Sequence, residues 1–516
     1  MASLKRNRTQ LITLGVLAFL FFTAVQGMET KDWAITILRG LSVGMVTFLV
    51  ASGLSLIFGL MDVLNLAHGE MFMLGAYVGW TVFVRPDSFA DALAPILLLA
   101  VGFVLMPVWR ALLGRWRGRT AVPAWPWLGL AAALVILAFT FLRFPVTKWD
   151  PEVYSESPIT FSLALDQDNL VLPEPVPFEG VSPILAVLGT LLGGSLLAAS
   201  IVGFGLRREM GAISPHIARE PVVTAVLLLV LGLAALWGND GLTAYLMEMG
   251  TTARFFLAMG VATIVGFVIG GVMETTMIRP LYDRPIYQLM ITLGVSFIVI
   301  EVARAIWGRP EFTMPKAALF TGRGDGCPAE SLGDLLAHHC STIILFDGRI
   351  RSYNEVFIIL VGLVVLVAVW LLLQRTRIGM IIRAGVQDSE MVEALGINVR
   401  RVFTFVFALG VALASLGGVL AAPSIGLSTA MGGQFLLLAL IALAIGGLTS
   451  FPGAAAGAIL VGLLQQFIIK YGQIGINIPF LEEPFKPSPP LVPASVVLLM
   501  VIILLALPNG LFGRNE

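Results

Sequence analysis

The chain has little charge, little cysteine and no excess of either charge sign. Charged residues make up 12% of its 516 residues, about half of the roughly 25% that soluble proteins carry. Its 32 basic and 32 acidic residues balance, so the composition does not suggest a nucleic-acid partner. Two cysteines are too few for a disulfide scaffold or a cysteine-rich metal site. Hydrophobic residues, at 58%, instead indicate an integral membrane protein.

Nucleotide-binding and catalytic motifs are also missing. No Gly-Lys dipeptide occurs, so the chain has no Walker A loop to hold a nucleotide phosphate. The stretch GLSVG at 40–44 matches the pattern of a nucleophile elbow, but it opens an apolar helix instead of following a strand. We therefore expect no enzyme activity, no cofactor and no ATP hydrolysis by this chain.

Long apolar runs predict the fold class. Runs of about 17 to 25 apolar residues are long enough to cross a bilayer as helices. They occur at 11–27, 36–58, 67–84, 93–109, 126–143, 183–205, 221–237, 255–275, 288–307, 355–373, 402–421, 434–448, 454–470 and 492–507. These runs predict an all-α polytopic integral membrane protein with about 14 transmembrane helices, roughly ten of them in a core and about four in an insertion.

Basic residues predict the orientation of these helices. Short loops rich in Lys and Arg are retained in the cytoplasm. With the N-terminal end inside, the basic segments that fall inside are 110–119, 207–219, 279–284, 375–401 and the C-terminal end. The acidic, proline-rich stretch 148–180 then falls outside. Residues 1–27 fit either an uncleaved first helix, which we favour, or a signal peptide. Both alternatives leave the later orientation unchanged.

Glycine is abundant, with 54 residues. Pairs of small residues four apart let helix backbones approach closely in lipid, where packing drives helix association. Such pairs are Gly40 with Gly44, Gly266 with Gly270, and Gly453 with Gly457. We expect them at helix contacts; chance spacing in a glycine-rich chain is the alternative.

The stretch GLMDVLNLAHGEMFMLGAY at 59–77 carries four polar residues in an apolar surrounding: Asp62, Asn65, His68 and Glu70. A carboxylate at the bilayer centre costs about 2.5 to 3.5 kcal/mol on insertion scales, so both acidic residues must face water or protein. Two placements satisfy this requirement, an interfacial turn or a helix break that lines a cavity. His68 and Glu70 are two apart, so they point to roughly opposite faces of a helix and are not expected to bind one metal.

Cys327 and Cys340 share one loop with His338 and His339. The predicted orientation places this loop outside, where an oxidising environment favours a disulfide between the two cysteines. A zinc site and two free thiols remain as alternatives.

The polar stretch also carries a resemblance to a known family. Its core, NLAHGE at 65–70 followed by Gly75 and Tyr77, resembles the signature of branched-chain amino-acid ABC transporter permeases of the Liv type, with Leu66 where that signature has Phe. Three further stretches fit in the same order: ETTMIRPLYDR (274–284) with TLGVSFIV (292–299), RAGVQDSEMVEALGINVRR (383–401), and IGGLTSFPGAAAGAILVG (445–462) with LPNGLFGR (507–514). The resemblance covers about 36–84 and 253–514.

This resemblance implies the membrane permease of an ATP-driven ABC importer in a bacterial inner membrane, with its C-terminus in the cytoplasm. The implied partners are two cytoplasmic ABC ATPase subunits, a second permease subunit, an external solute-binding protein and membrane lipid. Branched-chain amino acids are the implied solute. Urea or short-chain amides are the alternative within the family, and a stand-alone secondary transporter or channel is the alternative from another class. The implied solute path is bordered by Asp62, Asn65, His68, Gly69 and Glu70.

The stretch 383–401 predicts a contact with the ATPases. Asp388 fits an N-cap and Gly396 fits a C′ residue, which predicts a short helix over 389–395. Met391, Val392 and Leu395 would share one face, a pattern typical of a short helix laid into a partner's groove. With the resemblance, the implied coupling residues are Asp388, Glu390, Met391, Glu393, Leu395 and Gly396.

Three segments follow from these patterns. Residues 1–84 form an N-terminal membrane segment with the polar stretch, 85–252 form an insertion with a long external loop, and 253–516 form a permease core that contains the coupling loop 375–401. Typical members of the family resembled lack the insertion. Extra packing around the core and a docking surface for the solute-binding protein are the two alternatives for its role.

Overall fold

Helices make up most of the protein in a computed structural model. The structure describes residues 2–26, 28–115, 124–147, 150–167, 169–174, 176–178, 180–208, 219–324, 326–345, 347–387, 389–476 and 483–513. A single two-stranded sheet occurs within these ranges, so the predicted all-α class is confirmed. Parts of four predicted basic segments, at 116–119, 209–218, 388 and 514–516, lie outside the described residues.

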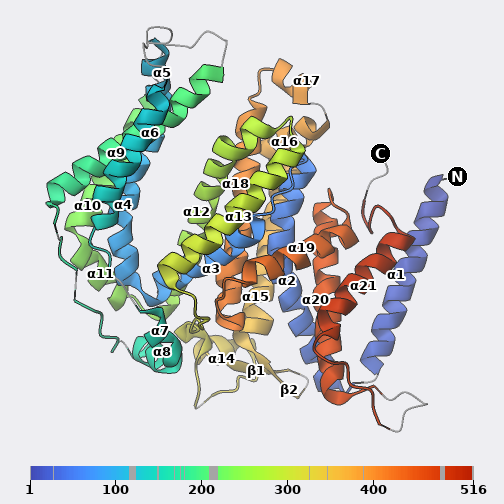
Figure 1. Ribbon diagram of the computed structural model, residues 1–516. Helices are drawn as coiled ribbons and strands as arrows, with labels where there is room; N and C mark the ends of the chain where they lie inside the picture. Colours follow the sequence, from blue (N-terminus) through green and yellow to red (C-terminus); the bar gives the residue numbers. More distant parts are fainter. Residues whose placement is uncertain are drawn as a thin grey trace. The chain divides into compact units, whose positions relative to one another are not determined.

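Each predicted span coincides with a helix (Figure 1). These helices are α1 (Ala2–Gln26), α2 (Thr30–Met61), α3 (His68–Val84), α4 (Pro86–Val104), α6 (Trp125–Thr140), α9 (Pro183–Arg208), α10 (Arg219–Trp237), α12 (Thr251–Met273), α13 (Pro285–Trp307), α15 (Ile358–Arg375), α18 (Val399–Ile425), α19 (Met431–Gly446), α20 (Phe451–Ile474) and α21 (Leu491–Ala506). Over the described ranges, 10 helices are long and apolar enough to cross a membrane, and shorter apolar helices accompany them. The chain is therefore a multi-pass membrane protein.

Shorter elements connect these helices. The α-helices among them are α5 (Met106–Arg115), α7 (Pro151–Glu156), α8 (Pro158–Asp166), α11 (Asn239–Glu248), α14 (Leu332–Ala337), α16 (Arg377–Gln387) and α17 (Ser389–Ala394). Strands β1 (Thr342–Leu345) and β2 (Gly348–Arg351) pair antiparallel. Five 3₁₀ or π segments are η1 (Phe141–Arg143), η2 (Glu274–Ile278), η3 (Arg279–Leu281), η4 (Ala318–Phe320) and η5 (Ser352–Phe357).

The chain divides into two compact units. Unit 1 comprises Met1–Trp80, Pro151–Asp166 and Thr251–Glu516, and unit 2 comprises Thr81–Asp150 and Gln167–Gly250. Residues 151–166 thus pack within unit 1, although they lie inside the segment predicted as an insertion. The reason is a contact of Tyr154, whose hydroxyl donates to the carbonyl oxygen of Thr313 at 2.7 Å and whose ring packs against Trp80.

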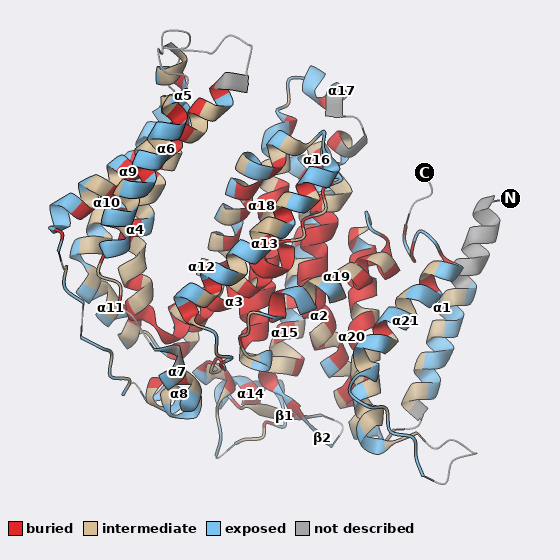
Figure 2. Cartoon of the chain, in the orientation of Figure 1, coloured by how far each residue is buried: buried red, intermediate tan, exposed pale blue. Residues whose placement is uncertain are grey.

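Helices α2 and α18 form the core of unit 1. Within their most apolar windows, 78% of α2 and 83% of α18 is buried, against 11–44% for the other long helices. Buried residues accordingly gather on α2, α3 and α18 in Figure 2. The remaining long helices turn much of their apolar surface outward, as expected of helices in contact with lipid.

Glycines at helix contacts permit this close packing. A Cβ on Gly44 of α2 would lie 2.9 Å from the Cα of Ile459 on α20, and one on Gly270 of α12 would lie 2.9 Å from the Cα of Ala408 on α18. Both distances are too short for any side chain. The pair at 453–457 approaches α19 in the same way. The predicted use of these small-residue pairs at helix contacts is therefore confirmed.

The two parts of the last family-like stretch, 445–462 and 507–514, meet through main-chain hydrogen bonds. The N–H of Leu511 donates to the carbonyl oxygen of Ile445 at 2.9 Å, and the N–H of Phe512 donates to that of Gly446 at 3.0 Å. The ending LPNGLFGR therefore satisfies carbonyls at the C-terminal end of α19, which a helix leaves without intrahelical partners.

The loop between α13 and α15 folds around a small core of its own. Ala329, Leu335, Ile343 and Ile350 are buried together, and Ser331 with Asp334 forms a capping box at the start of α14. A disulfide joins Cys327 and Cys340, with Cα atoms 5.5 Å apart. Of the three alternatives for these cysteines, the structure has the disulfide. In Figure 1 this loop lies at the end of unit 1 opposite α16 and α17.

Unit 2 is a bundle of α4, α6, α9 and α10. Helices α4 and α9 cross closely at Gly102, where a Cβ would lie 2.6 Å from the backbone nitrogen of Ser195. A separate core of Leu98, Phe144, Val181 and Ala186 holds one end of the bundle together. Unit 2 thus has an apolar core of its own.

Replacing Gly462 by Ala tests the α2–α20 contact. Its Cβ would lie 2.8 Å from the Cα of Gly44, so we expect overpacking to destabilise the protein by about 1–3 kcal/mol. Gly260→Ala on α12 is the matched control, because nothing lies within 4 Å of a Cβ there. Thermal unfolding in detergent measures both variants. Equal unfolding temperatures for the two would contradict the proposed packing role.

Candidate functional site

The polar stretch forms the connection between α2 and α3. Helix α2 ends at Met61, and Asp62 follows in the left-handed region with φ 52°. The chain then runs without helical structure until α3 begins at His68. The Nε2 of His68 lies 3.2 Å from the carbonyl oxygen of Val50. Val50 precedes the last residue of α2, Met61, by about eleven residues, which is about 16 Å along the helix. The chain therefore turns back alongside the apolar part of α2 before α3 starts.

This path separates Asp62 from the other predicted site residues. Asp62 is exposed at the end of α2. Asn65 and His68 are 0% exposed and Glu70 is 4% exposed, and Gly69 lies between them in the first turn of α3. The interfacial turn therefore applies to Asp62 alone, whereas the other four residues lie in a buried break.

Asn65 fixes the turn that opens α3. Its Oδ1 accepts a hydrogen bond from the N–H of Ala67 at 3.1 Å, and its carbonyl oxygen accepts one from the N–H of His68 at 3.3 Å. The N–H of Leu66 donates to the Oγ1 of Thr292 on α13 at 3.3 Å. These bonds satisfy irregular backbone, which is tolerated at membrane depth only beside protein or a water-filled path.

Three successive residues at the start of α3 contact three different helices. His68 faces α2, Gly69 approaches Gly432 of α19, and Glu70 lies next to Ser296 of α13. Successive helical residues are rotated by about 100°, so His68 and Glu70 point to different neighbours. No group of three potential metal ligands occurs within the described residues.

The position of the His68 side chain requires a glycine on α2. A Cβ on Gly53 would lie 2.8 Å from the Nε2 of His68 and would also overlap the carbonyl oxygen of Gly410 on α18. Gly53 therefore marks the place where α2, α3 and α18 converge. The sequence reasoning missed this residue, because it belongs to none of the three pairs identified by spacing.

The N-terminal ends of α3 and α19 meet at Gly69 and Gly432. A Cβ on Gly432 would lie 2.8 Å from the carbonyl oxygen of Gly69, so neither position has room for a side chain. Helix N-termini carry N–H groups without intrahelical partners and a partial positive charge, which favours an anion.

The sequence reasoning missed Gly432, although the polar, glycine-containing run at 425–433 before a short span resembles the break at 59–70.

Three buried polar atoms at this site have no hydrogen-bond partner within the described residues. They are the Nδ2 of Asn65, the Nδ1 of His68 and the Oε2 of Glu70. An unsatisfied buried polar group costs about 1–3 kcal/mol, and such groups in native proteins call for an explanation such as a functional role. An unmet donor on Asn65 and an unmet acceptor on Glu70 therefore lie within six residues of the chain.

A second predicted site lies in the loop 375–401, at α17. Gly396 has φ 81°, and its N–H donates to the carbonyl oxygen of Glu393 at 2.9 Å. The helix therefore ends at a left-handed glycine, as the sequence predicts. The predicted N-cap Asp388 lies outside the described residues, as does the side chain of Glu390.

The exposed face of α17 differs in part from the prediction. Met391 and Leu395 are 61% and 73% exposed, but Val392 is only 4% exposed. The prediction that Val392 shares the outward face is wrong. It follows Met391 by one residue and so lies about 100° around the helix, on the side where α17 packs against α16 and α18.

The stretch 274–284 forms a polar clasp that sequence reasoning did not assign. Arg279 donates to both carboxylate oxygens of buried Glu274, at 3.2 and 2.8 Å, and to the Oγ1 of Thr404 on α18 at 2.5 Å. The hydroxyl of Tyr282 also donates to Glu274. This clasp attaches the α12–α13 connection to the first turns of α18, next to α17.

Comparison with known proteins agrees with this architecture. A family model described as "Branched-chain amino acid transport system / permease component" matches residues 36–207 and 181–507. The chain is 26% identical over 278 residues to the high-affinity branched-chain amino acid transport system permease protein LivH of Salmonella typhimurium, covering 53% of this chain and 80% of that protein. It is 30% identical over 173 residues to the corresponding protein BraD of Pseudomonas aeruginosa, covering 33% and 51%. No solved structure matches the chain.

Glu70→Gln tests whether the buried break serves solute transport. The change keeps the shape of the side chain but leaves a group that cannot carry a negative charge for the solute, so we expect uptake to fall at least about tenfold, since a hydrogen bond to a charged group contributes about 1.5–3 kcal/mol. The complex should still assemble. Glu301→Gln on α13 is the control, because that carboxylate is 65% exposed and pairs with Arg304. Normal uptake by Glu70→Gln would assign the break a purely structural role.

Proposed function

The chain belongs to the branched-chain amino acid transport permease family, and we propose that it is the membrane permease of an ATP-driven ABC importer for branched-chain amino acids. Its place is a bacterial inner membrane, with the C-terminus in the cytoplasm. Two ABC ATPase subunits, a second permease subunit and an external solute-binding protein complete the importer. The described helices and the permeases to which the chain is similar support this assignment.

The observation that carries the proposal is the set of unmet hydrogen-bonding groups at the start of α3. An amino acid is a zwitterion, so it needs donors for its carboxylate and an acceptor for its ammonium group. The Nδ2 of Asn65 and the adjoining N-termini of α3 and α19 offer the donors, and the Oε2 of Glu70 offers the acceptor. Broken helices in transporters bind anionic solute groups in this manner.

The alternative solutes fit these groups less well. Urea and short-chain amides carry no carboxylate for two helix N-termini and no cation for Glu70. Asp62 takes no part in this contact, because it is exposed at the end of α2. We assign it to the mouth of the path, and we assign the contact itself to Asn65, His68, Gly69 and Glu70.

Helix α18 links the coupling helix to the solute site. It begins directly after α17, with Asn398 as its N-cap accepting from the N–H of Arg401 at 3.2 Å. Deeper along α18, the Oγ of Ser415 donates to the carbonyl oxygen of Met71 on α3 at 3.1 Å. A displacement of α17 by the ATPases would therefore be transmitted through one rigid helix to the first turn of α3. Rigid elements of this kind carry switching transitions.

An exposed helix of this type distinguishes an importer from a stand-alone carrier. Met391 and Leu395 present apolar side chains outward from a loop flanked by arginines. A carrier without ATPases has no use for such a surface. We therefore assign the coupling role to α17, with Glu393 on the same helix and Gly396 ending it, and place Asp388 and Glu390 at its start.

Uptake by the reconstituted complex tests the proposal. Proteoliposomes that contain the complex should accumulate leucine when ATP and the solute-binding protein are both supplied, because both partners are required in an ABC importer. Excess unlabelled isoleucine should compete, whereas urea should not. Accumulation without ATP would indicate a secondary transporter or channel, and competition by urea alone would move the chain to the urea branch of the family.

Changing Met391 and Leu395 together to Asp tests the coupling helix. Two charges in a groove contact should detach or uncouple the ATPases, so we expect co-purification and ATP-driven uptake to fall at least about tenfold. The matched control places two Asp at Leu332 and Leu336, which are 65% and 66% exposed on the short helix α14. Undiminished ATPase co-purification and uptake in the first variant would remove α17 from the interface.

A further inference from the structure

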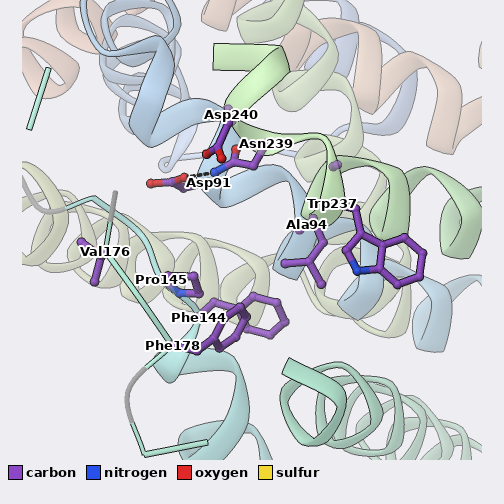
Figure 3. Close-up of a pocket in the computed structure, with 12 residues that line it drawn as sticks. Asp91, Ala94, Phe144, Pro145, Val176, Phe178, Trp237, Asn239 and Asp240 are labelled. Atoms are coloured by element: carbon purple, nitrogen blue, oxygen red, sulfur yellow. Dashed lines mark hydrogen bonds between the residues drawn. The ribbon is translucent and has the colours of Figure 1, made fainter. Parts of the chain in front are cut away.

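Unit 2 contains a cavity of about 170 Å³ (Figure 3). Its walls come from the first turns of α4, the segment that follows α6, residues 176–178, and the junction of α10 with α11. Under the predicted orientation these helix ends and connecting segments lie on the external side. The solute site described above draws none of its residues from these segments.

One end of the cavity is a carboxylate held by neutral donors. The Oδ2 of Asp91 accepts from the N–H and from the hydroxyl of Thr147, both at 2.7 Å. Its Oδ1 accepts from the Nδ2 of Asn239 at 2.6 Å. Three hydrogen bonds from uncharged donors therefore fix the position of the Asp91 carboxylate.

Further acceptors surround this carboxylate. The Oδ1 of Asn239 is buried and has no hydrogen-bond partner within the described residues. Asp240 follows at the first turn of α11, and Figure 3 shows its carboxylate at the same end of the cavity as Asp91. No ion pair to Asp91 or Asp240 is found in the described part of the chain. Among the described residues, two carboxylates and an unmet carbonyl thus lie together without a cationic partner.

The other end of the cavity is apolar. Phe144 and Phe178 meet edge to face, with ring centroids 5.7 Å apart, and Pro145 and Ala94 are among the other residues of the wall. Figure 3 shows these rings across the cavity from Asp91 and Asn239. Aromatic faces attract cations as well as apolar groups. The volume is below the roughly 300–1,000 Å³ of pockets for drug-sized ligands, so it suits a short apolar body.

We propose that this cavity binds a small organic cation, a primary ammonium group carried on a short apolar chain. The Thr147 hydroxyl and one N–H of the Asn239 amide donate to Asp91, and the Oδ1 of Asn239 and the carboxylate of Asp240 remain as acceptors at the polar end. An ammonium supplies three donors and a positive charge for these acceptors. A carboxylate on the same ligand would face Asp91 and Asp240, so anions and amino-acid zwitterions are excluded. This site is additional to the proposed function.

Binding of 3-methylbutylamine to the purified full chain in detergent tests the inference. This amine has the ammonium and side chain of leucine without the carboxylate. We expect saturable binding by calorimetry that leucine does not displace and that the uncharged 3-methylbutanol does not reproduce. Absence of saturable amine binding, or displacement of the amine by leucine, would overturn the proposal.

Matched variants locate the bound amine. Asp240→Asn should weaken amine binding about tenfold through loss of a charge-assisted contact, and Asp91→Asn should do the same if thermal unfolding shows that it folds. Glu248→Gln, an exposed carboxylate at the far end of α11, should leave binding unchanged. Glu70→Gln should also leave it unchanged, which keeps this site distinguishable from the proposed solute path. Wild-type amine affinity in Asp240→Asn would refute the site.

Discussion

The position of α3 depends on the contact of His68 with α2. The imidazole reaches the carbonyl oxygen of Val50 only because Gly53 leaves room for it. With His68 in this position, α3 has to start beside the apolar part of α2, and the segment before α3 has to run back into the buried interior. Irregular backbone at that depth needs hydrogen-bond partners, which Asn65 and Thr292 supply. The buried break and its unmet polar atoms follow from this one contact.

The same contact places α18 at the centre of unit 1. Gly53 approaches Gly410, and Ser415 is bonded to the main chain of α3, so α18 touches both sides of the break. Its other end carries α17 and the clasp of Glu274 and Arg279. Close packing without side chains at the crossings leaves little freedom for helices to slide independently. A movement at α17 would then shift α18 as one body.

Particular residues show how far sequence reasoning reaches. The helices follow from length and apolarity, since a bilayer admits little else, and the αL position of Gly396 follows from its chemistry. The prediction for Val392 was wrong because a hydrophobic side chain on a short helix can pack either into a partner's groove or against neighbouring helices of its own chain. Gly432 was missed because only the fold brings it to Gly69. Tyr154 binds Thr313 across a long sequence separation, so residues 151–166 pack in unit 1, which no local pattern indicated.

The sequence by itself determined the membrane class, the approximate positions of the apolar helices, the small-residue pairs and the family, because each of these is written in local composition, spacing or motif. Only the tertiary structure decided which polar residues are buried together. It left Asp62 exposed, gathered Asn65, His68, Gly69 and Glu70 at a break, and set Asp91 beside Asn239 in unit 2. The physical reason is that burial and hydrogen-bond partners depend on contacts between segments far apart in the chain, where one glycine determines how closely two helices approach.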